Sequence, residues 1–121
     1  MKKILAVTFI LFCATELSAQ GLSDIEKDAV KTAMIKELKD SDSAKYIWLD
    51  KGLDNGYCGL VNAKNSYGAY AGYIPFVSVV VETDEGETVA LILQIGSSDD
   101  KAEVVRRVCV DTGGYKLTDF Y

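Results

Sequence analysis

The side chains with the most potential for recognition lie between Tyr57 and Phe76, in the sequence YCGLVNAKNSYGAYAGYIPF. This stretch contains four of the seven tyrosines, the only proline and a cysteine. Tyrosine provides a large contact area at a small cost in side-chain entropy, and Gly, Ser and Asn adapt their hydrogen bonds to a partner. We therefore predict a binding surface made by Asn62, Lys64, Asn65, Tyr67, Tyr70 and Tyr73. Tyr57 is the fourth tyrosine of the same stretch.

A structural role explains the same residues on equally physical grounds. Aromatic side chains stabilise sheets through cross-strand pairs, and glycines let a strand bulge or bend. The side chains of Asn62 and Asn65 could instead bond to the backbone of a turn. Under this alternative Tyr67, Tyr70 and Tyr73 should be largely buried, so their exposure separates the two hypotheses.

The composition argues against most enzyme classes. The chain contains no histidine, which excludes Ser–His and Cys–His nucleophile pairs and the usual zinc ligand sets. Asp40–Ser43 resembles the start of a calcium loop, but Lys45 and Lys51 stand where that loop needs Gly and Glu. We predict no catalytic residue, no metal and no cofactor. A small hydrolase that uses two carboxylates is the enzyme alternative.

The N-terminal residues have the features of a secretory signal peptide. Lys2 and Lys3 precede the apolar run Ile4–Ala14, and small residues follow at Ser18 and Ala19. The run is too short to span a membrane, which takes about 20 apolar residues. We predict that residues 1–19 are removed, that residues 20–121 form a single domain, and that the protein is periplasmic or secreted.

The net charge limits the choice of partner. Removal of residues 1–19 takes away two lysines and one glutamate, which changes the net charge from −5 to −6. A surface this acidic repels nucleic acid and anionic lipid. We therefore predict a protein partner in the cell envelope, with an inhibitor or immunity-type factor against a cationic envelope enzyme as the concrete form. A structural envelope component without a binding site is the alternative.

Two cysteines, Cys58 and Cys109, remain after the signal peptide is removed, since Cys13 lies within it. An even pair in an exported chain predicts one disulfide bond. Closing a loop of about 50 residues contributes roughly 4 kcal/mol in the chain-entropy description. Two separate buried thiols are the alternative.

The pattern of apolar residues predicts an α+β fold. An amphipathic helix is expected over Gly21–Asp40, because Ser23 and Glu26 form a capping box before an apolar stripe. A short C-terminal helix capped by Ser97 or Ser98 should follow an antiparallel sheet of four to five strands, with Cys109 tied to the second strand. The strands are expected at Ala44–Asp50, Tyr57–Ala63, Tyr67–Glu82 and Thr88–Ile95, with a possible edge strand at Tyr115–Tyr121.

Two segments together resemble a family of small exported bacterial and prophage proteins. Leu38–Tyr46 (LKDSDSAKY) and Tyr57–Phe76 match the family pattern LKDPxSAKF followed by CGxVNAKNSYGGYxGxxPF. Ser41 replaces a common proline and Ala69 a common glycine, and neither change threatens the fold. The family has no assigned activity, so the resemblance implies export and the importance of the tyrosine-rich segment, and it implies no catalytic residues.

Overall fold

The computed structural model describes residues 21–53 and 55–121. The predicted signal peptide and the bond after Ala19 lie outside the described residues. The described residues form two helices, a four-stranded sheet and a 3-10 helix, in an order that confirms the predicted α+β class. Their bounds are α1 Asp24–Met34, β1 Lys45–Ile47, β2 Gly56–Asn62, β3 Ile74–Glu82, β4 Thr88–Ile95, α2 Asp99–Asp111 and η1 Leu117–Phe120.

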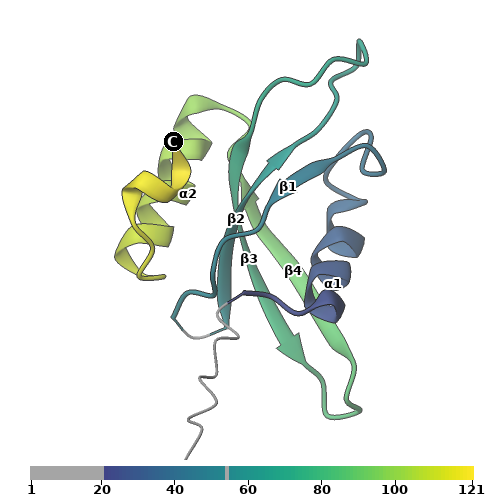
Figure 1. The fold of residues 1–121 in the computed structure, drawn as a ribbon, viewed down its shortest axis with the longest axis vertical. Helices are drawn as coiled ribbons and strands as arrows, with labels where there is room; N and C mark the ends of the chain where they lie inside the picture. The colour runs from purple at the N-terminus through teal and green to yellow at the C-terminus, as the bar shows by residue number, and fades with distance from the viewer. Residues whose placement is uncertain (1–20, 54) are drawn as a thin grey trace, which may run out of the picture.

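The sheet is an antiparallel meander in the order β1-β2-β3-β4. The helices lie on its opposite sides, so the molecule has three layers (Figure 1). The central strand β2 contacts both helices, because successive side chains of a strand point to opposite faces of the sheet. Tyr57 and Val61 join the core under α1, whereas Cys58 and Leu60 join the core under α2.

Helix α1 begins as predicted and ends earlier than predicted. The capping box is present, since the Ser23 hydroxyl accepts from the Glu26 N–H and the Glu26 carboxylate accepts from the Ser23 N–H. The helix stops at Met34 rather than continuing to Asp40. The Met34 carbonyl accepts from the N–H groups of both Glu37 and Leu38, which winds a turn that brings Leu38 against the core.

Two predicted strand boundaries are wrong, and one possible strand is replaced by a helix. β1 has only three residues, and Trp48 beyond it stacks on Tyr46 with ring centroids 4.6 Å apart on the α1 side. β3 begins at Ile74 instead of Tyr67, because the preceding residues form a loop in which Gly72 has φ of 104°. The predicted edge strand at Tyr115–Tyr121 is instead a short 3-10 helix, which packs Phe120 into the core under α2.

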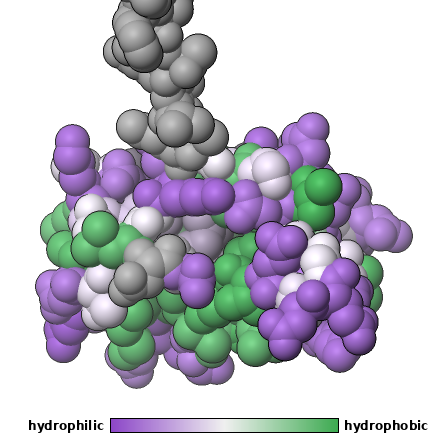
Figure 2. Space-filling view, turned by 90° about the horizontal axis from the view of Figure 1, so that it is seen from below, coloured by the Kyte–Doolittle hydropathy of each residue, from purple (hydrophilic) through white to green (hydrophobic). Residues whose placement is uncertain are grey.

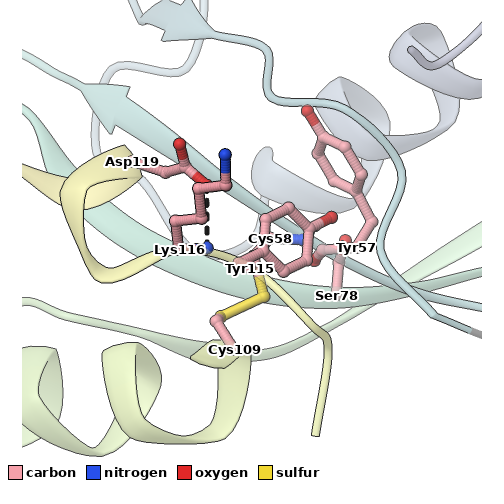
Figure 3. The surroundings of a disulfide bond; sticks show 7 residues. All are labelled: Tyr57, Cys58, Ser78, Cys109, Tyr115, Lys116 and Asp119. Atoms are coloured by element: carbon pink, nitrogen blue, oxygen red, sulfur yellow. Dashed lines mark hydrogen bonds between the residues drawn. A yellow bond between two sulfur atoms is a disulfide. The ribbon is translucent and has the colours of Figure 1, made fainter. Parts of the chain in front are cut away.

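The predicted disulfide between Cys58 and Cys109 is confirmed, with a Cα–Cα distance of 6.2 Å. It joins the centre of β2 to the last turn of α2, and both cysteines are buried. The Tyr115 ring lies beside the bond (Figure 3), and its hydroxyl accepts the Cys58 N–H at 3.1 Å. The end of the chain is therefore attached to β2 by a covalent bond and by a buried hydrogen bond.

We expect the double variant Cys58→Ala, Cys109→Ala to unfold with a free energy lower by about 4 kcal/mol, because the disulfide closes a separation of 51 residues. Urea unfolding of the oxidised protein and the variant measures this difference. The reduced wild type, unfolded in the presence of dithiothreitol, is the control and should match the variant. A difference below about 1 kcal/mol would contradict the proposed contribution.

Stability should also fall at alkaline pH. Burial raises the pKa of Tyr57, Tyr46 and Tyr115 above the ordinary value of 10.0. The unfolded chain then loses these phenolic protons at a lower pH than the folded chain, so their contribution is complete below about pH 10 and is lost as the pH rises further. Urea unfolding between about pH 9 and pH 11 measures the loss.

The variant Tyr57→Phe serves as the control for this pH dependence. It should be less stable than the wild type at neutral pH, because the Tyr57 hydroxyl donates to the Leu49 carbonyl at 2.9 Å. Its stability should nevertheless fall less steeply above about pH 10, since one buried hydroxyl no longer titrates. If the free energy of unfolding falls equally steeply with pH in the two proteins, Tyr57 does not cause the loss of stability at alkaline pH.

Candidate functional site

The candidate site is the tyrosine loop, residues 63–73, which joins β2 to β3. The strand pairing ends at Val61 and Ile74, and the loop projects beyond the sheet at the top of Figure 1. Lys64 and Tyr70 pair again in an isolated antiparallel bridge. At the tip the Asn65 N–H donates to the Ala69 carbonyl at 2.8 Å, and the Gly68 N–H donates to the Asn65 carbonyl at 3.0 Å.

The two asparagines hold the loop backbone in shape. The Asn65 side-chain oxygen accepts from the N–H groups of Tyr67 at 2.9 Å and Ala69 at 3.2 Å. The Asn62 side-chain oxygen accepts from the Gly72 N–H at 3.1 Å. Gly68 has φ of 80°, a left-handed conformation that a side chain would strain, so the tip requires glycine there. Both asparagine oxygens therefore bond to turn backbone, which is the arrangement that the structural alternative describes.

Tyr70 attaches the loop to the segment before β1. Its hydroxyl donates to the Ser43 carbonyl at 2.8 Å, and its side chain is 38 % exposed. The Lys45 and Lys64 ammonium groups lie 4.4 Å and 5.6 Å from the centre of its ring. Cation–π contacts of this kind contribute about 0.5–1 kcal/mol at exposed sites. Tyr70 thus acts as a brace that joins the loop to residues 43–45.

Tyr67 is the most exposed of the predicted contact residues. Its side chain is 96 % exposed, and that of Tyr73 is 44 % exposed. Tyr57, which belongs to the same tyrosine-rich stretch, is buried in the core beneath α1. The alternation of β2 explains this placement, because Tyr57 lies on the face that α1 covers.

The charge around the loop differs from that of the whole protein. The chain has a net charge of −5, yet Lys64 is the only charged residue between Asn55 and Val81. Lys39 approaches from the segment after α1, and its ammonium donates to the Ser66 hydroxyl at 2.8 Å. Lys39, Lys45 and Lys64 therefore all reach the loop, and Asp40 and Asp42 lie in the same segment as Lys39 and Lys45.

Sequence reasoning did not identify Lys39, Ser43 and Lys45 as part of the site. Lys39 and Ser43 contact residues 27 positions further along the chain, and the antiparallel pairing of β1 with β2 brings Lys45 to the loop. The resemblance offered the one available signal, since its first segment, Leu38–Tyr46, contains all three residues.

Within residues 21–53 and 55–121, no cluster of three or more His, Cys, Asp or Glu side chains could hold a metal ion. No helix in this part of the chain is long and apolar enough to cross a membrane. In comparisons with protein-family models, with curated proteins and with solved structures, nothing matches the chain.

We expect Asn65→Ala to loosen the loop without unfolding the domain, because the exposed side chain holds only loop backbone. The amides of Tyr67 and Ala69 should exchange with solvent at least about tenfold faster. The global free energy of unfolding should fall by no more than about 1 kcal/mol. Hydrogen exchange measured by NMR tests both expectations. Tyr67→Ser is a matched control, because it keeps the backbone N–H groups that donate to the Asn65 side chain. Unchanged exchange at Ala69 would contradict the bracing role of Asn65.

Proposed function

We propose that the protein is an exported, non-enzymatic binding protein that presents the tyrosine loop to a protein of the cell envelope. The observation that carries the proposal is Tyr67, a large aromatic side chain that is 96 % exposed at the tip of a loop with a fixed backbone. Exposed aromatic side chains on ordered loops are typical contact residues, because little entropy is lost when they bind.

The exposure of the loop supports contact over packing. If the segment existed only to stabilise the sheet, Tyr67 would pack against a neighbour, yet it is almost fully accessible. The division of roles within the loop also fits a contact surface. Asn62, Asn65 and Tyr70 hold the backbone in place, while Tyr67 and Tyr73 remain available to a partner.

The buried disulfide supports a location outside the reducing cytoplasm, because such bonds persist in oxidising compartments. An inhibitor or immunity-type factor for an envelope enzyme is the form of the proposal that we favour. The net negative charge of the whole protein suits a cationic enzyme as the partner.

Replacement of Tyr67 by alanine tests the proposed function. Tyr67→Ala should reduce capture of the partner from envelope extract at least about tenfold, since contact tyrosines at the centre of an interface are typical hot spots. The melting temperature should stay within about 1 °C of the wild type, because an exposed side chain contributes little to folding. The measurement is a pull-down with immobilised protein. The protein is expressed with residues 1–19 present and is purified before it is immobilised.

Tyr121 offers a matched control for this experiment. It is also a tyrosine, 83 % exposed, and it directly follows η1 instead of lying in the loop. Tyr121→Ala should capture the same partner as the wild type. Equal loss of capture in both variants would contradict a site centred on the loop. Failure of the wild type to enrich any envelope protein over a control resin would favour the structural alternative.

A further inference from the structure

The two edge strands of the sheet differ in how they are protected from further pairing. β1 is only three residues long and begins with Lys45, and short edge strands that carry lysine resist pairing with another chain. β4 is the other edge strand, and its eight residues, TVALILQI, include neither proline nor a charged residue. Within the described residues, no strand lies beyond it. β4 is therefore the edge that is open to a further strand.

Hydrogen bonds on the two sides of β3 show which way the backbone of β4 points. The Thr83 N–H donates to the Glu87 carbonyl at 2.7 Å, on the β4 side, while the Val80 N–H donates to the Asn55 carbonyl at 3.1 Å, on the β2 side. Val80 pairs with Ala90, and backbone groups alternate in direction along an antiparallel strand. The N–H and C=O groups of Ala90 therefore point away from β3, toward the open edge.

Thr88 and Ile92 have the same orientation as Ala90, because each lies two residues from it along β4. Among residues 21–53 and 55–121, no other backbone group bonds to the outward N–H and C=O groups of these three residues. A row of alternating donors and acceptors at this spacing is complementary to the backbone of another extended segment. The edge itself thus specifies the conformation of what can bind there.

A groove follows this edge between β4 and α1, which lie side by side in Figure 1. Its volume is about 580 Å³. Residues 87–92 form one wall, and Ile25, Ala29 and Ala33 contribute an apolar part of the other wall. Ile25 is 68 % exposed, so it is accessible to a side chain that enters the groove. The groove can receive the side chains on one face of an added strand.

The opposite face of β4 is apolar as well. Val89 and Leu91 alternate with Ala90 along the strand, and Leu91 is 63 % exposed. Figure 2 views the molecule from the end where β3 and β4 are joined, and hydrophobic surface gathers over its middle and lower part, between hydrophilic flanks. A strand paired with β4 therefore places its alternate side chains beside apolar residues on both faces of the sheet.

The charges along the edge are mostly negative. The acidic residues that line the groove or lie in the turn before β4 are Asp28, Glu37, Asp84, Glu85 and Glu87. Lys36 also lines the groove, and at the far end of β4 Lys101 directly follows Asp99 and Asp100. A second copy of β4 would bring the same acidic groups together, so the charges favour a partner strand with Lys or Arg.

We propose that β4 pairs with an extended segment of a partner protein, which becomes a fifth strand of the sheet. The segment has alternating apolar side chains and is flanked by Lys or Arg. Its backbone bonds to the outward groups of Thr88, Ala90 and Ile92 and provides the affinity, while the groove beside α1 selects among side chains. This second contact site does not include the tyrosine loop, which joins β2 to β3.

A synthetic peptide of sequence KVTVTVK, acetylated and amidated, tests the proposal at concentrations up to about 1 mM. Hydrogen exchange of the wild-type protein, measured by NMR, gives an alternating signature. The amides of Thr88, Ala90 and Ile92 should exchange at least about fivefold more slowly with the peptide, because they gain acceptors. The amides of Val89 and Leu91 should change little, since they already donate to β3. Unchanged exchange at all three outward amides would overturn the proposal.

Two altered peptides separate backbone pairing from other contacts. N-methylation of the five central residues keeps the side chains and removes the donors, so it should weaken binding at least about tenfold. Replacement of both lysines by glutamate should weaken binding at least about fivefold at low salt. Equal binding of the N-methylated peptide would overturn strand pairing, and equal binding of the glutamate peptide would overturn the basic character of the partner.

Protein variants locate the site. Glu87→Lys should weaken binding of the KVTVTVK peptide at least about threefold, because it reverses a charge at the groove. Asp111→Lys is the matched control, since it makes the same charge change at an exposed position at the end of α2. Tyr67→Ala should also bind the peptide like the wild type, which distinguishes this site from the tyrosine loop. Loss of peptide binding in Tyr67→Ala would place the peptide at the loop and overturn the proposal.

Discussion

The disulfide between Cys58 and Cys109 is the constraint on which the C-terminal half of the structure depends. It attaches α2 to the centre of β2, and the Tyr115 hydroxyl bonds to the backbone of the same β2 residue. The core under α2 is small, and its larger members are Leu60, Val105, Tyr115 and Phe120. A cluster of this size stabilises a helix weakly, so a covalent bond that restricts the unfolded chain supplies much of what holds this layer in place.

The other core depends on aromatic packing instead of a covalent bond. Tyr57 and Phe76 from the central strands meet Tyr46 and Trp48 from the edge, and α1 closes over them with Val30 and Met34. β2 contributes to both cores through alternate residues, which makes it the element that couples the two layers. Because β2 also leads directly into the tyrosine loop, this double burial fixes the position from which the loop projects.

The sequence was sufficient to predict the fold class, the disulfide and the start of α1, because each depends on a short-range or compositional signal. Ser23 and Glu26 form a local capping box, and the two cysteines that remain once the predicted signal peptide is set aside leave one pairing. The end of α1 and the shape of the C-terminal tail were not predictable in this way. Leu38 and Phe120 turn inward because of cores assembled from distant strands, and no local pattern in the chain records those contacts.

The site shows the same division between local and distant signals. The tyrosine-rich composition pointed to residues 57–76, but only the fold separates Tyr57, which is buried, from Tyr67, which is exposed. It also brings Ser43 and Lys45 to Tyr70 across the β1–β2 pairing. A loop with no other purpose than to connect two strands would not need a brace from a third, since two-residue turns join such strands readily. The length of the loop, its internal hydrogen bonds and its anchor to residues 43–45 are therefore features of a surface held in one conformation for contact.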